Sequence, residues 1–408
     1  MVERRVETRQ IVQKPSANWH GKAVLIAKPG GPDTGVGRYV QMLHSGLRQA
    51  GIDTVRVAPA LPPLPNAGYS LFRRLGMDLP AFLTNYPIWA IYPQADVYHL
   101  TSQNLASLLL FRRPRGKVVV TVHDIIPYML RNDPQLSTYR TVADRLFDRL
   151  AMAGLKRADH LIAVSRYTRQ CVVEHLGIAP EKIAVVRLGI DHERFRPLPV
   201  PATIRERYGL PEGRRYLIYV GSEDPRKNLI TLVRALAQIR RELPDVQLIK
   251  VGQARHDRGR QRLLELATRL EVRAAIHFLE DVPENDLPLL YNVADVCVMP
   301  SLYEGFGFPL LEAMACGTPV VCANGASLPE IGGTGGLLFQ HGPAAVENLA
   351  SALLQVLTHR NLSLAMRAQG QDHAAAFNWS DTTYKTLTVY LGEAVNRKAQ
   401  MHNTTIGP

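Results

Sequence analysis

The chain has 408 residues, of which 46% are hydrophobic, so it is too long for one ordinary domain and too apolar for a disordered protein. Its N-terminus lacks the apolar core of a signal peptide, and no apolar run is long enough for a transmembrane helix. The cysteines show neither a disulfide framework nor a Cys-x-x-Cys metal pair; they are Cys171, Cys297, Cys316 and Cys322. We therefore expect a cytoplasmic protein with two hydrophobic cores.

The positive charge lies in the first half of the chain. Residues 1–198 hold 27 Lys and Arg against 15 Asp and Glu, whereas residues 199–408 hold 21 of each. A basic surface favours an anionic partner, such as a phosphate-bearing acceptor or the inner face of a membrane, where peripheral contact is expected. The sequence shows no nucleic-acid-binding module, so nucleic acid is not an expected partner. A generally basic protein without such a partner is the alternative.

Short apolar runs that predict β-strands alternate with helical patterns along the whole chain. The runs of the first half are residues 23–27, 54–57, 97–100, 118–122, 161–164 and 183–187. Those of the second half are residues 216–220, 247–251, 276–279, 296–299, 319–322 and 336–339. Each set predicts a parallel sheet with helices on both faces.

The sequence therefore predicts an α/β fold with two Rossmann-like domains whose parallel sheets face a central cleft. The first domain is residues 1–198, with residues 1–20 as a loose tail, and the second is residues 199–375. Three prolines within Arg196–Pro201 predict the connector between them. Residues 376–408 form a C-terminal segment with a capped helix that extends to Val395.

Residues 59–95 interrupt the regular alternation. They hold seven prolines, which prevent one long helix. Their aromatic residues include Phe72, Phe82, Tyr86, Trp89 and Tyr92. Together with the Arg73-Arg74 pair, these aromatics fit a membrane interface. The alternative, which we favour, is a loop excursion that packs its aromatic side chains on the first domain.

Two loops of the first half follow predicted strands at the expected cleft. The first, Gly30–Tyr39, is rich in glycine, which lets the backbone approach a ligand before the next helix begins. It does not predict an NAD site, because Val40 occupies the place of the third Rossmann glycine and no acidic residue follows Val57 directly. The second loop holds His123 and Asp124, and either residue alone is usually structural.

A charged turn with Arg226 and Lys227 follows the first strand of the second half. Ligands of open α/β sheets bind at this edge of the strands. Two cations there would stabilise the negative charge that develops on a departing phosphate group. Taken alone, the pair also fits an exposed helix start with ordinary basic residues.

The segment Glu304–Glu312 is the most informative part of the sequence. Gly305 and Gly307 permit a tight turn after a buried strand, and Pro309 fits the first position of a helix whose first turn would carry Glu312. Free N–H groups and the helix dipole favour a diphosphate at such a helix start. Carboxylates beside it would accept hydrogen bonds from hydroxyl groups instead, so the simplest ligand is a nucleotide sugar.

This segment resembles the Glu-x7-Glu signature of retaining glycosyltransferases with the GT-B fold, in the group called glycosyltransferase family 4. The resemblance continues through Ala313–Val321. It includes the elements Pro225–Asn228, Gly35–Tyr39 and Thr121–Asp124. It covers most of the chain and is strongest in residues 216–340. In members of this family a C-terminal helix crosses back to the first domain.

The resemblance implies roles for individual residues. Glu304 would contact the donor hexose, and Glu312 would contact the ribose of the nucleotide. Arg226 and Lys227 would contact the diphosphate. They would carry more of this interaction than in some members, because Ser222 stands where those members have another arginine.

His123 would position the reacting sugar, which makes it a catalytic residue together with Arg226, Lys227 and Glu304. Asp124 and Arg38 are assigned to the acceptor. The remaining donor-binding residues are Gly35, Gly37, Gly252, Val282, Gly305, Phe306, Gly307 and Leu310. In relatives, the region around Val282 holds the base through backbone contacts, so the sequence leaves the base open.

The resemblance implies a retaining hexosyltransferase that uses a nucleotide diphosphate sugar and a saccharide or lipid-linked acceptor, in cell-envelope or exopolysaccharide synthesis. The His123-Asp124 pair favours GDP-mannose, with a UDP-hexose as the alternative donor. No metal or other cofactor is expected. Three other functions stay open: a sugar-nucleotide epimerase or hydrolase of the same fold, a non-catalytic nucleotide-sugar-binding subunit, and a basic binder of membranes or nucleic acid.

Overall fold

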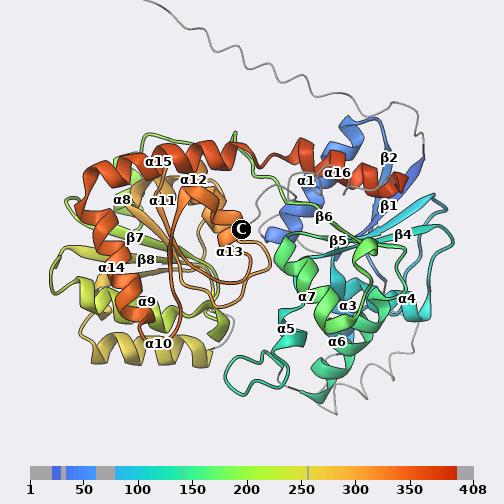
Figure 1. The fold of residues 1–408 in the computed structure, drawn as a ribbon, viewed down its shortest axis with the longest axis horizontal. Helices are drawn as coiled ribbons and strands as arrows, with labels where there is room; N and C mark the ends of the chain where they lie inside the picture. Colours follow the sequence, from blue (N-terminus) through green and yellow to red (C-terminus); the bar gives the residue numbers. More distant parts are fainter. Residues whose placement is uncertain (1–20, 29–33, 61–78, 140, 255–256, 393–408) are drawn as a thin grey trace, which may run out of the picture.

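The computed structural model describes residues 21–28, 34–60, 79–139, 141–254 and 257–392, which fold around two separate parallel sheets (Figure 1). The predicted tail and the beginning of the first glycine-rich loop lie outside these ranges. In the described part of the chain, no helix is long and apolar enough to cross a membrane.

The N-terminal domain is built on a six-stranded sheet with the order β2-β1-β3-β4-β5-β6. Its strands are β1 (Lys22–Ile26), β2 (Asp53–Val57), β3 (Val97–Leu100), β4 (Lys117–Val122), β5 (His160–Ala163) and β6 (Ile183–Val185). Its helices are α1 (Gly35–Gln49), α3 (Leu79–Asn85), η1 (Gln103–Ser107), α4 (Leu108–Phe111), α5 (Ile126–Met129), α6 (Val142–Leu155), α7 (Arg166–Leu176) and η2 (Pro180–Lys182).

The C-terminal domain is built on a second six-stranded sheet with the order β12-β11-β10-β7-β8-β9. Its strands are β7 (Arg215–Val220), β8 (Val246–Val251), β9 (Ile276–Leu279), β10 (Val296–Met299), β11 (Val320–Ala323) and β12 (Gly336–Phe339). Its helices are α8 (Ala202–Arg207), η3 (Pro225–Lys227), α9 (Leu229–Ile239), α10 (Asp257–Arg269), η4 (Arg273–Ala275), α11 (Leu287–Val293), α12 (Phe308–Ala315), α13 (Leu328–Gly332), η5 (Gly333–Gly335), α14 (Ala345–Thr358) and α15 (Arg360–Ala375).

All twelve predicted strands are present, with ends that differ from the prediction by two residues at most. Most strands are nearly continuous apolar runs because helices cover both faces of each sheet (Figure 1). Every residue of β3, β10 and β11 is buried. The four cysteines are buried and unpaired, as small core residues.

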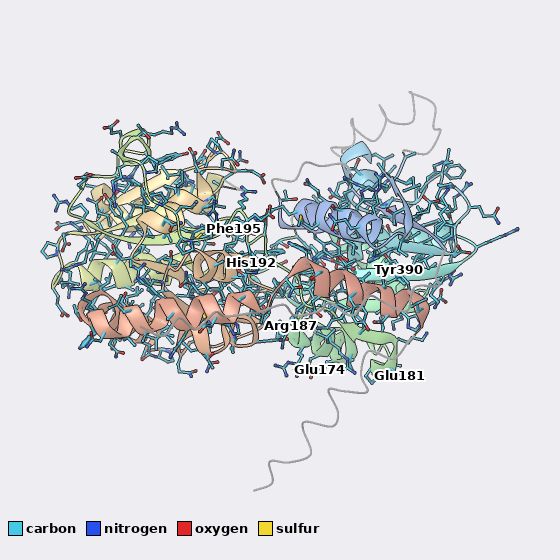
Figure 2. The ribbon with its side chains drawn as sticks, turned by 90° about the horizontal axis from the view of Figure 1, so that it is seen from above. Glu174, Glu181, Arg187, His192, Phe195 and Tyr390 are labelled. Atoms are coloured by element: carbon cyan, nitrogen blue, oxygen red, sulfur yellow. The ribbon has the colours of Figure 1, made fainter. Side chains whose placement is uncertain are left out.

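The chain passes between the domains twice, and the two passages pack on each other. The backbone N–H of Ile190, in the passage after β6, donates to the carbonyl of Phe377 in the passage after α15 (3.1 Å). A Cβ on Gly189 would lie 2.3 Å from the backbone nitrogen of Trp379, so this close approach requires glycine. Figure 2 shows Arg187, His192 and Phe195 at this junction.

The last helix, α16 (Trp379–Leu391), lies on the N-terminal domain, whereas α15 lies on the C-terminal domain (Figure 1). Asn378 caps α16 by accepting a hydrogen bond from the N–H of Asp381 (2.8 Å). The helix ends at Leu391, before the predicted end at Val395, because Gly392 adopts a left-handed conformation (φ 76°).

Part of the proline-rich excursion packs on the N-terminal domain. The rings of Phe82 and Tyr86 stack on Phe147, with centroid distances of 5.3 Å and 6.0 Å. The predicted packing of aromatic side chains is therefore present for these two residues. Phe72 and the Arg73-Arg74 pair lie outside the described residues.

Candidate active site

The loop after β10 makes direct contact with the end of β4 in the other domain. A Cβ on Gly305 would lie 2.0 Å from the carbonyl oxygen of His123 and 2.9 Å from the Cβ of Asp124. The Ser165 hydroxyl, which also caps α7, donates to the carbonyl of Gly305 (2.7 Å). The two predicted site segments, one from each domain, therefore touch through their backbones.

Glu304 lies at the centre of a buried charged cluster. Its carboxylate accepts hydrogen bonds from Lys227 Nζ (2.5 Å) and Ser301 Oγ (2.8 Å), and Arg226 Nη1 lies 3.5 Å away. Burial opposes ionisation of this carboxyl group, but the charges of Lys227 and Arg226 outweigh burial and hold its pKa below the usual value. Arg226 also donates to the carbonyl of Tyr303 (2.9 Å). The structure thus brings three predicted catalytic residues together.

The start of α12 follows this cluster closely in the chain. Gly307 is the N-cap in a left-handed conformation (φ 113°), and no side chain caps the helix. Phe308 is the first helical residue and Pro309 the second, so Glu312 lies on the second turn and the expected first-turn position was wrong. Pro309 has no N–H and that of Leu310 donates to the Gly307 carbonyl (3.1 Å), so it is mainly the positive end of the helix dipole that favours an anion here.

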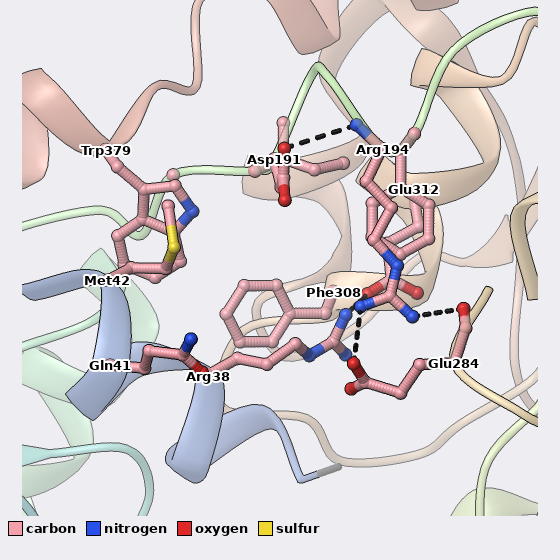
Figure 3. A pocket seen from close by; sticks show the side chains of 12 residues that line it. Arg38, Gln41, Met42, Asp191, Arg194, Glu284, Phe308, Glu312 and Trp379 are labelled. Atoms are coloured by element: carbon pink, nitrogen blue, oxygen red, sulfur yellow. Dashed lines mark hydrogen bonds and ion pairs between the residues drawn. The ribbon is translucent and has the colours of Figure 1, made fainter. Parts of the chain in front are cut away.

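Glu312 is almost fully buried and has partners from both domains. Its Oε1 accepts a hydrogen bond from Arg38 Nη1 (2.6 Å), and its Oε2 accepts one from the Tyr291 hydroxyl (2.8 Å). Arg38, which the resemblance assigned to the acceptor, therefore contacts the carboxylate assigned to the donor ribose. Figure 3 shows this pair at the wall of a cavity of about 250 Å³ between the domains.

His123 is held in a defined tautomer. Its Nε2 lies 3.0 Å from the carbonyl oxygen of Thr101, which can only accept, so Nε2 carries the proton and Nδ1 is the acceptor. Burial lowers the pKa of the His123 imidazole, which keeps the ring neutral. Asp124 Oδ1 accepts a hydrogen bond from the N–H of Ile126 (3.1 Å) at the start of α5.

A chain of buried hydrogen bonds connects α16 with the ring that packs on His123. Tyr390 on α16 bonds His99 Nδ1 (2.7 Å), and His99 Nε2 bonds the Thr121 hydroxyl (2.7 Å). Thr121 in turn bonds the Tyr39 hydroxyl (2.8 Å), and the Tyr39 ring meets the His123 ring edge-on at 5.1 Å. Burial lowers the pKa of His99 to about 3, so this ring is neutral.

Replacing Tyr390 with phenylalanine should lower the free energy of unfolding by about 1–3 kcal/mol, because a buried ring nitrogen of His99 would lose its partner. Urea denaturation measures this change. The matched control is Tyr384→Phe on the same helix, where the side chain is exposed and the expected change is within about 0.5 kcal/mol. Equal stability of the two variants would contradict the role of the buried chain.

The other predicted donor-binding residues are hydrophobic residues and glycines. Phe306 and Leu310 are buried in the hydrophobic core. Val282 is half-buried against the same core. The N–H of Gly37 donates to the Thr34 hydroxyl that caps α1 (3.0 Å), and is therefore already occupied.

Two predicted glycines lie at close contacts. A Cβ on Gly35 would lie 3.2 Å from the ring of Phe308, across the domain boundary. Gly252 has a positive φ of 114°, and its Cβ would lie 2.9 Å from the carbonyl of Gly221. Contact between the two loop backbones thus explains Gly252 without reference to a nucleotide.

Sequence reasoning missed several residues that line the cavity or join the domains. Arg194 and Phe195, from the passage after β6, line the cavity with Trp379 from α16. Glu330 on α13 accepts from the backbone N–H of Arg166 (2.7 Å) and from Arg187 Nε (3.1 Å) in the N-terminal domain. None of these residues lies in a motif, and their contacts depend on how the domains meet.

The described residues contain no group of three or more His, Cys, Asp or Glu side chains that could hold a metal ion. The cations beside Glu304 are Arg226 and Lys227 on η3.

Two six-stranded parallel sheets with their site loops in contact form the fold of the GT-B class of glycosyltransferases. Solved structures have the same fold. A sucrose-phosphate synthase from Thermosynechococcus elongatus is 21% identical, covers 91% of this chain and 98% of its own, and gives a TM-score of 0.69. Anabaena HepE, solved with UDP and glucose, is 20% identical, covers 91% and 100%, and gives a TM-score of 0.67.

The chain belongs to the group 1 glycosyltransferases of family 4. The model for glycosyl transferases group 1 matches residues 201–373, and the model for glycosyltransferase family 4 matches residues 34–194. O-antigen chain mannosyltransferase B of Escherichia coli is 28% identical over 88% of this chain and 96% of its own length. A D-inositol 3-phosphate glycosyltransferase of Salinispora tropica is 35% identical over 58% of this chain and 52% of its own length.

Proposed function

We propose that the chain is a retaining hexosyltransferase that moves a hexose from a nucleotide diphosphate sugar to a hydroxyl group of a saccharide or lipid-linked acceptor. The observation that carries this proposal is the cluster of Glu304, Arg226 and Lys227 beside the uncapped start of α12, in contact with the other domain at His123. In this proposal the diphosphate lies against the two cations and the start of α12, and Glu304 and His123 both contact the sugar.

Mannose from GDP-mannose is the favoured donor, with a UDP-hexose as the alternative. The match to an O-antigen chain mannosyltransferase along almost all of that protein supports mannose and a role in cell-envelope polysaccharide synthesis. Structures of HepE with UDP and with UDP-glucose support a nucleotide-sugar donor more generally. The basic residues 1–198 support a place at the cytoplasmic face of the membrane.

The proposed reaction is a displacement on one face of the sugar. The bond between C1 and the diphosphate oxygen breaks while the acceptor oxygen bonds C1 on the same face, and the departing phosphate oxygen takes the acceptor proton. Arg226, Lys227 and the dipole of α12 stabilise the charge that develops on the diphosphate. Nδ1 of neutral His123 accepts a hydrogen bond from a hexose hydroxyl, and Glu304 holds the sugar from the opposite side.

Thermal-shift measurements with GDP, UDP, ADP and their sugars test the donor. A ligand at about one hundred times its Kd adds about 2.7 kcal/mol to the stability of the folded protein. Transfer to simple glycosides is then followed by mass spectrometry, and NMR of the product gives its anomeric configuration. A product with inverted configuration would contradict retention. Donor consumption without any transfer product would favour the hydrolase or epimerase instead.

Transfer should continue at an unchanged rate in an excess of a chelating agent, because Arg226, Lys227 and the α12 dipole neutralise the departing diphosphate. Initial rates of the dialysed protein with EDTA, and with added Mg²⁺, measure this. An absolute requirement for a divalent cation would contradict the metal-free part of the proposal.

A further inference from the structure

Arg38 reaches from the N-terminal domain into the donor side of the C-terminal domain. It is the fourth residue of α1, and its Nη1 lies 2.6 Å from Glu312 Oε1 on α12. The Glu312 side chain is only 1% exposed, and that of Arg38 is 23% exposed. A buried carboxylate of this kind depends strongly on its cationic partner, because an unpaired charge in the interior is costly.

Aromatic rings from two other segments hold the guanidinium of Arg38 in place. Its Cζ lies 5.5 Å from the centroid of the Phe308 ring on α12 and 5.9 Å from that of the Phe195 ring in the passage between domains. Figure 3 shows Arg38 and Phe308 at the wall of the cavity, with Glu312 beyond them. The position of the guanidinium is therefore set by both domains together.

The carboxylate of Glu312 keeps capacity for a ligand in this arrangement. Arg38 occupies one position on Oε1, and the Tyr291 hydroxyl occupies one on Oε2. Each carboxylate oxygen can accept two hydrogen bonds, so each retains a position for one hydroxyl group of a diol. Arg38 and Tyr291 thus fix the plane of the carboxylate without using all of its acceptors.

We propose that Arg38 is a positioning residue for the donor, which orients Glu312 from the opposite domain so that this carboxylate binds the two ribose hydroxyls. The inference rests on the proposed assignment of Glu312 to the ribose. It makes donor affinity depend on a residue of the N-terminal domain, and it replaces the acceptor role that the resemblance implied for Arg38.

Calorimetric titration with GDP and UDP, and with their 2′-deoxy and 3′-deoxy forms, tests this proposal. The variants are Arg38→Ala, Arg38→Lys and, as control, Arg187→Ala, which removes a different ion pair between the domains at Glu330. In the wild-type protein, loss of one ribose hydroxyl should weaken binding by about tenfold or more, as expected for a hydrogen bond to a charged group.

Arg38→Ala should weaken binding of the ribonucleotide by about tenfold or more, and should also lose most of the discrimination against the deoxy forms. Arg38→Lys keeps the charge but loses the planar guanidinium. It should therefore retain part of the affinity for the ribonucleotide and part of the discrimination against the deoxy forms. Arg187→Ala should keep the full discrimination, because it does not contact Glu312.

Four outcomes would overturn the inference. Unchanged affinity of Arg38→Ala for the nucleotide would favour the acceptor role for Arg38. Tighter binding would show that Arg38 competes with the ribose for the Glu312 carboxylate. An equal loss for ribonucleotides and deoxynucleotides would reduce its role to general stability. If the wild-type protein bound no nucleoside diphosphate at all, the proposed function itself would fail, and this inference with it.

Discussion

Replacing Lys227 with methionine should lower the turnover number of hexosyl transfer by about 10²–10³-fold, the usual effect of removing one preorganised group that stabilises developing charge. Lys227 lies on η3 with its ammonium group 2.5 Å from Glu304, beside the uncapped start of α12. The diphosphate gains negative charge as its bond to the sugar breaks. The loss of this cation should therefore raise the energy of the transition state more than that of the bound donor.

Steady-state kinetics at saturating donor measure this prediction, with thermal unfolding as the check on folding. Glu304 keeps Ser301 and Arg226 as partners in the variant, which limits the loss of stability. Lys385→Ala is the matched control, because this lysine pairs with Asp381 on the exposed side of α16. If the Lys227→Met variant had the same turnover number as the wild type or the control, Lys227 would have no role in the chemical step.

Much of the fold follows from local sequence pattern. Most strands are short apolar runs because helices cover both faces of each sheet, so such a run marks a buried strand. The edge strand β2 is an exception, with Asp53 and Arg56 exposed. The two errors at helix ends come from glycines in left-handed conformations. With Gly307 as its N-cap, α12 begins at Phe308, one residue before the predicted first residue Pro309. With Gly392 as its C-cap, α16 ends at Leu391 and not at the predicted Val395. Gly392 was a readable signal, because glycine commonly follows the last residue of a helix.

The charged cluster of Arg226, Lys227 and Glu304 could also be predicted from the sequence. β7 and β10 are neighbours in the sheet, with Leu217 paired to Val296, so the loops that follow them must meet at one edge. That rule brings Arg226 and Lys227 to Glu304. The contact between Arg38 and Glu312 is different, because it joins residues 274 positions apart in two domains. No periodicity or spacing encodes how two rigid domains meet, and such a pair becomes visible only in the assembled structure.

Replacing Gly305 with alanine should lower the catalytic efficiency of transfer by about 10²-fold or more, the cost expected when reacting groups are misplaced by about 1 Å. The added Cβ would lie 2.0 Å from the carbonyl oxygen of His123. The obstacle is backbone, so no change of rotamer relieves the contact, and the domains must separate. Separation would also lengthen the hydrogen bond from Ser165 to the Gly305 carbonyl.

The backbone at Gly305 has no positive φ, so alanine fits it locally and each domain should stay folded. Kinetics, circular dichroism and small-angle X-ray scattering together test this prediction: activity should fall and the radius of gyration should rise while helix content stays constant. Gly342→Ala is the control, because its added Cβ meets nothing within 4 Å; it should keep activity despite the strain of a positive φ. A Gly305→Ala protein with normal kinetics would show that contact between the loop after β10 and the end of β4 is not needed for transfer.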